Sequence, residues 1–245
     1  VARLQTVVRE HGFGSFAEYC QYLQSDTSGH SLIELADRIS THHSFFYREP
    51  GHFRYLAHHG LPEVTGRRKV ERRRAIRIWS AGCAEGEEAY TVVMMLLEHF
   101  GATYKSWDTG VLATDISARS LDAARRGVYK ADRLKHLPSH LRLSYFTHEG
   151  NNSWKVVPSV QREVTFRRLN LMNPRFPFKQ PFDFIFCRNV MIYFDASTRE
   201  ALVRRLFEYT APGGYLFIGH SESLPRSCCP YEFMESATYR RPLES

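Results

Sequence analysis

The sequence is short of several features that would classify it at once. Its 245 residues include only five cysteines, an odd number, and no two of them form a C-x-x-C pair. A disulfide framework and a cysteine-bound zinc site are therefore disfavoured, and a protein of the reducing cytoplasm is expected. The longest apolar stretch without a charge, residues 89–97, is far shorter than the roughly 20 residues that span a bilayer. Residues 1–22 are polar and charged throughout, so neither a signal peptide nor membrane insertion is expected.

Metal ligands are not grouped in the sequence either. The 12 histidines include the doublets His42-His43 and His58-His59, and neither has metal-ligand spacing to another histidine or cysteine. The adjacent Cys228 and Cys229 are interpreted as packing or surface residues. We therefore predict that the protein holds no metal.

The positive charge is concentrated in one segment. Residues 66–77, GRRKVERRRAIR, contain seven basic residues and one acidic residue, and they account for +6 of the net charge of +7. The segment is either a solvated linker or a surface that attracts an acidic partner, protein or nucleic acid. RNA-binding surfaces usually carry exposed aromatic side chains among the basic ones, and this segment has none. No DNA partner is expected.

The first quarter of the chain predicts a small helical domain. Residues 15–18, SFAE, match a capping box that should open a helix running to about Gln24. Apolar residues between 32 and 39 have helical spacing and predict a second helix. Glu49-Pro50 should open a third helix, which Leu61-Pro62 should end.

From residue 75 onward, short apolar strands alternate with helices. The predicted strands are residues 76–81, 110–114, 164–169, 182–187, 215–219 and, at a sheet edge, 237–241. The predicted helices are residues 87–100, the stretch from the cap Ser117 to Gly127, and residues 196–209 after the cap Asp195. Such alternation is typical of a mostly parallel, Rossmann-like α/β sheet with helices on both faces.

The alternation breaks between residues 145 and 163. Residues 143–147 and 154–157 have the pattern of two strands, joined by the favourable turn residues Gly150-Asn151-Asn152. We expect an antiparallel hairpin here that stands off the main sheet with an exposed edge. The predicted organisation is a helical domain (1–61), a basic linker (62–74) and an α/β domain (75–245) with this hairpin inserted at about 145–163.

The turn after the first predicted strand carries a ligand signal. Gly82 and Gly86 lie in this turn, and Asp115 ends the next strand, where an acid can accept hydrogen bonds from ribose hydroxyls. The third glycine of a G-x-G-x-x-G motif is missing, and Glu87-Glu88 stand where a pyrophosphate would bind. A nicotinamide or flavin dinucleotide is therefore disfavoured. Carboxylates suit a cationic ligand without phosphates, and S-adenosylmethionine is such a ligand.

Polar residues also follow two later strands. Asn170-Leu171 come after the strand at 164–169, where an amide side chain and a backbone N–H suit an adenine edge. Arg188-Asn189 come after the strand at 182–187, and Tyr193 follows one helical turn later. Ligands of open α/β sheets bind at the carboxyl ends of the strands, so we expect these residues in one cleft.

Six segments, taken together and in this order, resemble the CheR family of chemotaxis receptor methyltransferases along essentially the whole chain. They are SFFYREPGHF (44–53), WSAGCAEGEEAY (79–90), LATDIS (112–117), RRGVY (125–129), FDFIFCRNVMIYF (182–194) and PGGYLFIGHSESL (212–224). The resemblance implies S-adenosylmethionine as cofactor, with S-adenosylhomocysteine as product. It implies methylation of glutamate side chains on the cytoplasmic helices of chemoreceptors, in adaptation of chemotaxis signalling. It also implies an N-terminal helical domain and an inserted β-subdomain, and a monomer is expected.

The resemblance further implies a set of cofactor contacts. They fall on His42, Ser44, Arg48, Glu88, Asp115, Asn170, Leu171, Arg188 and Asn189, to which the glycine turn adds Gly82. The family commonly has asparagine where His42 stands and threonine where Ser44 stands. Serine keeps the hydroxyl, whereas the charge of His42 can vary with pH. Glu87 is interpreted as a solvated acid at a helix start.

The expected chemistry needs no general base. A glutamate carboxylate has a pKa of about 4.3 and is already ionised at neutral pH, so alignment with the methyl group is the main requirement. Arg48 is the catalytic candidate that holds the carboxylate or the cofactor end beside it. Tyr193 is the candidate that donates a hydrogen bond to position the substrate.

The basic residues 67–74 and the helical domain are the candidate docking surfaces for an acidic receptor helix. The loop at residues 147–153 is short and has one glycine, which favours an enzyme that does not capture a receptor tail by strand addition. Two alternatives stay open: a methyltransferase of the same fold that acts on another protein or on RNA, and a non-catalytic S-adenosylmethionine-binding signalling module.

Overall fold

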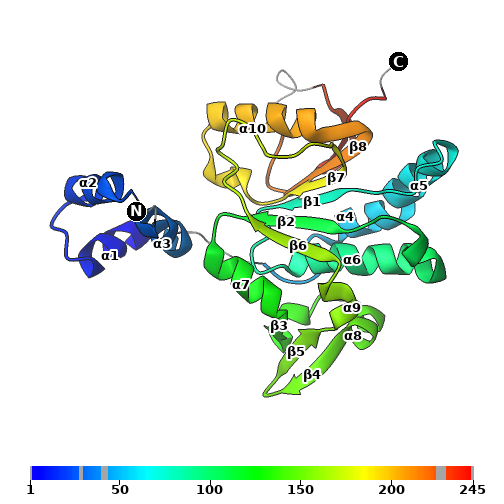
Figure 1. Cartoon of the computed structure of the whole chain (residues 1–245), viewed down its shortest axis with the longest axis horizontal. Helices are drawn as coiled ribbons and strands as arrows, with labels where there is room; N and C mark the ends of the chain where they lie inside the picture. Colours follow the sequence, from blue (N-terminus) through cyan, green and yellow to red (C-terminus); the bar gives the residue numbers. More distant parts are fainter. Residues whose placement is uncertain (1, 28–29, 40–43, 225–229, 244–245) are drawn as a thin grey trace.

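The structure, a computed structural model, describes residues 2–27, 30–39, 44–224 and 230–243 (Figure 1). Three helices at the N-terminal end stand beside a larger α/β body (Figure 1). They are α1 (Ala2–Glu10), α2 (Phe16–Ser25) and α3 (His30–Ile39). These helices bury a small core of their own, which consists of Val7, Val8, Tyr19 and Leu23 with partly buried neighbours.

The predicted capping box is confirmed in α2. The Ser15 hydroxyl accepts a hydrogen bond from the Glu18 amide at 3.2 Å, and the Glu18 carboxylate accepts one from the Gly14 amide at 3.0 Å. The helix predicted from the apolar spacing at 32–39 is α3, which begins at His30. Helix α1 was not predicted, because its residues carry no capping or turn signal.

Seven strands form the central sheet, in the order β6-β2-β1-β7-β8-β10-β9. The parallel strands are β1 (Ile78–Ala81), β2 (Val111–Asp115), β6 (Val164–Arg168), β7 (Phe182–Cys187) and β8 (Thr210–Ile218). From β1 the chain adds β2 and β6 on one side, and then crosses back to add β7 and β8 on the other. The strand order therefore reverses at β1, which is where open α/β sheets bind ligands. The predicted α/β fold with a mostly parallel sheet is confirmed.

Helices cover both faces of this sheet. Helix α10 (Ala196–Tyr209) lies on one face, and α6 (Glu87–Phe100) and α7 (Ala118–Arg126) lie on the other (Figure 1). The predicted caps are confirmed: the Ser117 hydroxyl accepts from the Ser120 amide at 3.0 Å, and the Asp195 carboxylate accepts from the Thr198 amide at 2.8 Å. These local signals explain why the bounds of these helices were predicted closely.

The third predicted helix does not end at Leu61-Pro62. Helix α4 (Pro50–Tyr55) continues through a π turn, η1 (Leu56–Gly60), into α5 (Leu61–Val70). Pro62 falls in the first turn of α5, where its missing N–H is tolerated. The prediction of a linker at 62–74 is therefore wrong for its first part, which is helical.

The segment that contains α4 and α5 packs against the sheet. Phe46, Phe53, Leu56 and Leu61 are fully buried in the same core as the side chains of β1, β7 and α6. The first two basic residues of the run, which belong to the last turns of α5, contact this body. The Arg68 guanidinium pairs with the buried Asp183 carboxylate at 2.5 Å, and Arg67 donates to the Gly213 carbonyl at 3.3 Å.

The far edge of the sheet differs from the prediction at residues 237–241. Strand β10 (Thr238–Arg240) lies between β8 and β9 (Glu232–Glu235), so β9 is the edge strand. Strand β8 begins at Thr210, earlier than predicted, because Thr210 pairs with Phe182 ahead of an irregularity in the ladder. Such pairings between distant residues leave no local signal.

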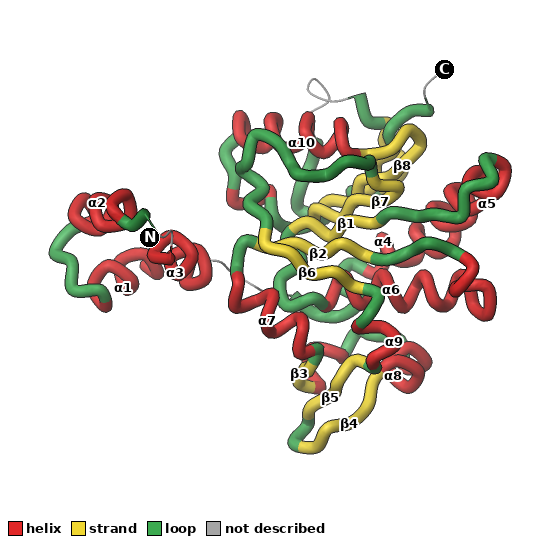
Figure 2. The backbone as a smooth tube through the Cα atoms, viewed as in Figure 1, coloured by secondary structure: helices red, strands yellow, loops and turns green. Residues whose placement is uncertain are grey.

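A second, three-stranded antiparallel sheet stands off the main one (Figure 2). The predicted hairpin is present as β4 (Phe146–Gly150) and β5 (Ser153–Val156), with Asn151 and Asn152 at positive φ in the turn. The prediction of a strand at 143–145 is wrong, because these residues form the last turn of helix α8 (Ser139–Tyr145). Strand β3 (Val128–Lys130) was not predicted and pairs with β5. The shorter helices are η2 (Gly101–Ser106), η3 (Ala131–Leu134), α8 (Ser139–Tyr145), α9 (Pro158–Gln161) and η4 (Met191–Tyr193). Among the described residues, no helix combines the length and apolar character that crossing a membrane requires.

Candidate functional site

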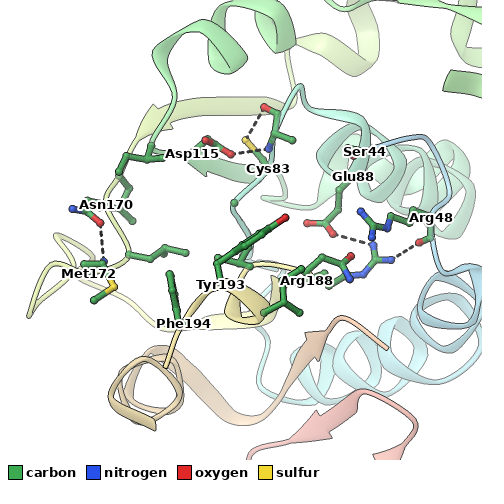
Figure 3. A pocket seen from close by; sticks show the side chains of 18 of the residues that line it. Ser44, Arg48, Cys83, Glu88, Asp115, Asn170, Met172, Arg188, Tyr193 and Phe194 are labelled. Atoms are coloured by element: carbon green, nitrogen blue, oxygen red, sulfur yellow. Dashed lines mark hydrogen bonds and ion pairs between the residues drawn. The ribbon is translucent and has the colours of Figure 1, made fainter. Parts of the chain in front are cut away.

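A cavity of about 510 Å³ lies at the carboxyl ends of β1, β2, β6 and β7 (Figure 3). Every predicted site residue that the structure describes lines it: Ser44, Arg48, Gly82, Glu88, Asp115, Asn170, Leu171, Arg188, Asn189 and Tyr193. His42 lies outside the described residues. The expectation that these residues share one cleft is therefore confirmed for the described set, whereas their individual roles remain predictions.

The turn after β1 needs its two glycines. Gly82 has φ of +79°, and a Cβ atom there would lie 2.5 Å from a methyl carbon of Val190. Gly86 has φ of +94°, and a Cβ atom there would lie 2.9 Å from Ala124. Glycine alone tolerates both the backbone conformation and the close approach. The turn thus brings backbone against the cavity, as the sequence motif predicted.

Asp115 is held rigidly at the end of β2. One carboxylate oxygen accepts a hydrogen bond from the Ala84 amide at 2.9 Å, and the other accepts one from the Ser117 amide at 2.9 Å. The side chain is 6% exposed and lines the cavity. Each carboxylate oxygen has two lone pairs, so Asp115 can accept further hydrogen bonds from a ligand while both backbone contacts persist.

Arg188 is the hub of a buried charge network on the other side of the cavity. Its guanidinium pairs with Glu88 at 2.9 Å and donates to the Arg48 carbonyl (Figure 3). It also pairs with Glu49 at 3.1 Å. The second Glu88 oxygen accepts from the Ser80 hydroxyl at 2.6 Å. The buried Arg188 charge is therefore matched by two carboxylates, as a buried ion requires.

Sequence reasoning assigned Glu49 only the start of a helix, and its role in this network was missed. Its carboxylate also accepts from the Asn189 side chain at 3.2 Å and from the His220 amide at 3.3 Å. Burial alone would raise the pKa of Glu49, but the Arg188 guanidinium and these hydrogen bonds outweigh burial and lower it. Glu49 itself has φ of +56°, a strained conformation for this residue type. The network therefore fixes the backbone next to Arg48 in a conformation that the chain would not otherwise prefer.

Glu222 is a second missed residue. It accepts hydrogen bonds from the amides of Gly219 at 2.6 Å, Asn189 at 3.0 Å and Ile192 at 3.1 Å. These bonds tie the loop after β8 to the loop after β7, which carries Tyr193. Burial raises the pKa of Glu222, and the backbone amides oppose that shift. The motif PGGYLFIGHSESL contains this glutamate, but nothing in the motif indicates which residues the glutamate contacts.

The mouth of the cavity is apolar and exposed. Tyr193 is 62% exposed, and Ile192 and Met172 are almost half exposed. Figure 3 shows the Tyr193 ring between the side of the cavity that carries Asn170 and the side that carries Arg188. The Arg48 guanidinium lies 5.9 Å from the centre of the Phe45 ring, and both residues line the cavity. The two catalytic candidates thus belong to one cavity, with Tyr193 at its entrance.

One group among the described residues has the atom types of a metal site. Ligand atoms of Glu49, His52 and His220 lie within 4.8 Å of one another. Burial, with the nearby Arg188 charge, lowers the pKa of His52 to about 3, so its ring is neutral. Both Glu49 oxygens already accept hydrogen bonds from Arg188, Asn189 and the His220 amide. We therefore assign this carboxylate to the arginine network, and the prediction of no metal remains a prediction.

Comparisons with known proteins found a matching family model and several similar proteins. Residues 42–240 match the family model described as CheR methyltransferase, SAM binding domain. Over 240 residues the chain is 42% identical to the chemotaxis protein methyltransferase of Borreliella burgdorferi, covering 98% of this chain and 84% of that protein. It is 38% identical to chemotaxis protein methyltransferase 2 of Pseudomonas aeruginosa, covering 91% and 77% of the two chains. It is 35% identical to the chemotaxis protein methyltransferase of Escherichia coli, covering 90% and 74%.

Proposed function

Because the chain belongs to the CheR family of S-adenosylmethionine-dependent chemotaxis methyltransferases, we propose that it methylates glutamate side chains on the cytoplasmic helices of a chemoreceptor. The family membership and the cofactor inferred from the sequence are both confirmed by this match. The receptor as substrate is a more specific inference than the family and the cofactor. It is supported by the placement of Arg48, Tyr193 and the cofactor candidates in one cavity, whose mouth is exposed.

The cavity suits S-adenosylmethionine in size and charge. Its volume of about 510 Å³ lies within the usual range for small-molecule sites. Glu88, in the first turn of α6, lines the cavity, and a carboxylate there would repel a pyrophosphate and favour a cationic ligand. Asp115, fixed by two backbone amides, is proposed to accept hydrogen bonds from the ribose hydroxyls.

Asn170 and Leu171 are proposed to contact the adenine. The Asn170 side-chain oxygen accepts from the Met172 amide at 2.9 Å, which fixes the orientation of the side chain. Its amide nitrogen is then the group that can donate to an adenine ring nitrogen. Glu88 and Arg188 are proposed to shape the end of the cavity that receives the ribose or the methionine part, through their mutual ion pair.

When bound, S-adenosylmethionine supplies a methyl group on a sulfonium, which a glutamate carboxylate accepts as a methyl ester. The carboxylate is ionised at neutral pH, so the chain needs to align it rather than to deprotonate it. Arg48 is proposed to hold it through one oxygen, because a grip on both oxygens would weaken the nucleophile. Tyr193 is proposed to donate a hydrogen bond from the entrance and to limit the access of water.

The receptor helix is proposed to approach over the rim formed by Met172, Ile192 and Tyr193. The basic run at 67–74 lies before β1, at the amino end of the strand, whereas the cavity lies at its carboxyl end. That position disfavours the basic run as the surface that presents the glutamate. The helical domain remains the candidate for a further contact with the receptor.

The deciding experiment is incubation with methyl-labelled S-adenosylmethionine and the cytoplasmic fragment of a chemoreceptor. We expect label to appear in the fragment as methyl esters that alkali releases. Label that is stable to alkali would support the alternative of another substrate, as would transfer of label to RNA when RNA replaces the receptor fragment. Binding of S-adenosylmethionine without transfer to any receptor fragment would support the non-catalytic module.

A further inference from the structure

One wall of the cofactor cavity is supported from outside by the small-sheet region. Ser44 and Phe45, which line the cavity, lie just before Phe46, whose side chain is fully buried. The Phe46 ring meets the Tyr129 ring of β3 at 4.8 Å and the Phe146 ring of β4 at 5.1 Å, both edge to face. Such pairs add to the stability that burial provides. The small sheet therefore packs against and supports the segment that leads to Arg48.

Arg133, in η3 just after β3, adds charged contacts that support the same segment. Its guanidinium pairs with Glu85 at 2.6 Å and with Glu87 at 3.3 Å, and it donates a hydrogen bond to the Ser44 carbonyl. Its own carbonyl accepts from the Phe46 amide at 3.0 Å. One residue outside the cavity thus joins the segment before α4 to the glycine turn and to the start of α6.

Glu87 makes this arrangement consequential. The sequence predicted a solvated acid, but the Glu87 side chain is fully buried. Burial raises the pKa of Glu87, and the Arg133 guanidinium opposes that shift. The neighbouring residue, Glu88, lines the cavity and pairs with Arg188. A displaced Glu87 would therefore move the turn of α6 that carries Glu88.

We propose that Arg133 is a positioning residue of the S-adenosylmethionine site, which fixes Ser44 and the first turn of α6 without lining the cavity. The proposal rests on the cofactor assignment above. It gives the small sheet a role within the enzyme, independent of any partner that binds its open edge.

The test compares Arg133→Met with Arg240→Met. Arg240 is a matched control, because its side chain is 25% exposed against 24% for Arg133 and it also pairs with two carboxylates, Glu63 and Glu232. It belongs to β10, which is separated from β7 by β8. Calorimetry with S-adenosylhomocysteine should show affinity lowered by about tenfold in Arg133→Met, as expected for loss of one partner of a buried ion pair, and unchanged in Arg240→Met.

Kinetics separate positioning from a general loss of structure. In Arg133→Met, the KM for S-adenosylmethionine should rise by about tenfold, while kcat at saturating cofactor stays within about twofold, because the variant acts on cofactor binding. The variant should also bind S-adenosylhomocysteine less well as the pH rises, since Glu87 must then be ionised without its counter-charge. The wild type should not show this dependence to the same degree.

The double variant Arg133→Met with Glu87→Gln supplies the rescue. It removes the uncompensated charge, so it should recover part of the lost affinity and lose the added pH dependence. It also keeps the test open if Arg133→Met alone does not fold. Unchanged affinity in Arg133→Met, an equal loss in Arg240→Met, or no recovery in the double variant would overturn the proposal. If the wild type itself failed to bind S-adenosylhomocysteine, the cofactor assignment would be at fault instead.

Discussion

The two ends of the main sheet carry cavities of almost equal volume and very different character. The cavity at the carboxyl ends of the strands measures about 510 Å³, and one at the amino ends of the same four strands measures about 500 Å³. The second is lined by residues at the strand starts, among them Arg77, Asp108 and Lys179. Volume and the presence of charged residues therefore do not distinguish a binding site from a surface hollow.

The difference lies in how the charged side chains are held. At the carboxyl end, Asp115 is fixed by two backbone amides, and Arg188 is fixed by two carboxylates. At the amino end, Asp108 and Arg77 are exposed. The glycine turn and the start of α6 also face only the first cavity. Preorganisation at the strand ends where the order reverses is what favours the first cavity as the proposed site.

The largest difference between the two ends is expected when an arginine at each end is replaced by alanine and methyl transfer is compared. Arg48→Ala should reduce methyl transfer by about 10²–10³-fold at saturating cofactor, the usual effect of losing one preorganised donor. Arg77→Ala, at the other end, should leave transfer unchanged. Release of methyl esters from a receptor fragment is the measurement. Full turnover of Arg48→Ala with saturating cofactor would remove Arg48 from its proposed role.

The acids should differ by a smaller factor. Asp115→Asn should weaken binding of S-adenosylhomocysteine by about 10- to 100-fold, because hydrogen bonds to a charged group contribute about 1.5–3 kcal/mol. Asp108→Asn should bind the ligand as the wild type does. Isothermal titration calorimetry of both variants checks this expectation. Equal affinities in the two variants would mean that Asp115 has only the structural role of holding Ala84 and Ser117.

Much of this site follows from local patterns in the sequence. The glycine turn, the acid that ends β2 and the polar residues that end β6 and β7 were recognisable, because each feature lies within a few residues of the strand that positions it. The same holds for α7 and α10, whose side-chain caps are local, and for α6, which begins directly after the second glycine of the turn. The resemblance to the family then selected Ser44 and Arg48, which no strand-end rule would have found.

The missed parts depend on contacts between distant residues. Glu49 meets Arg188 across 139 positions, and Arg133 meets Ser44 across 89. The pairing of β3 with β5 and of β8 with β10 likewise joins segments whose sequences give no sign that they are neighbours. The continuation of α4 into α5 was missed for another reason. Pro62 is a local signal for a helix end, whereas the π turn before it, in which Leu56 and Gly60 are buried, joins the two helices.

Two buried ion pairs, one at each end of the sheet, extend the comparison to the stability of the fold. Glu49→Gln breaks a pair at the cavity, and Asp183→Asn breaks the Arg68–Asp183 pair at the amino end of β7. Both variants should lower the free energy of unfolding at pH 7, but by less than the about 3–5 kcal/mol of a fully unpaired buried charge, because Arg188 keeps Glu88 and Arg68 keeps Glu71. Only Glu49→Gln should also weaken S-adenosylhomocysteine binding, which calorimetry would show. Weaker binding in both would mean that the two ends are not independent.

Glu49→Gln should also change how the free energy of unfolding depends on pH, because the pKa of Glu49 is lowered in the folded chain. The folded chain keeps this carboxylate ionised at pH values where the unfolded chain, with a pKa of about 4.3, already takes up a proton. Its contribution to stability is therefore present above that pH and is lost as the pH falls through the lower, folded pKa. Acid unfolding curves should be less steep in the variant than in the wild type. Identical curves would exclude Glu49 as a contributor.

The smallest effect is expected at the entrance. Tyr193→Phe keeps the ring that lines the cavity and removes only the hydroxyl, so transfer should slow by about 2- to 10-fold, the range for one neutral hydrogen bond. Binding of S-adenosylhomocysteine should stay as in the wild type, since the ring and its apolar contacts remain. Tyr239→Phe, in β10 on the other side of β8, is the matched control and should change neither quantity. A loss of cofactor affinity in Tyr193→Phe without a change in kcat would mean that the hydroxyl contacts the cofactor rather than the receptor glutamate.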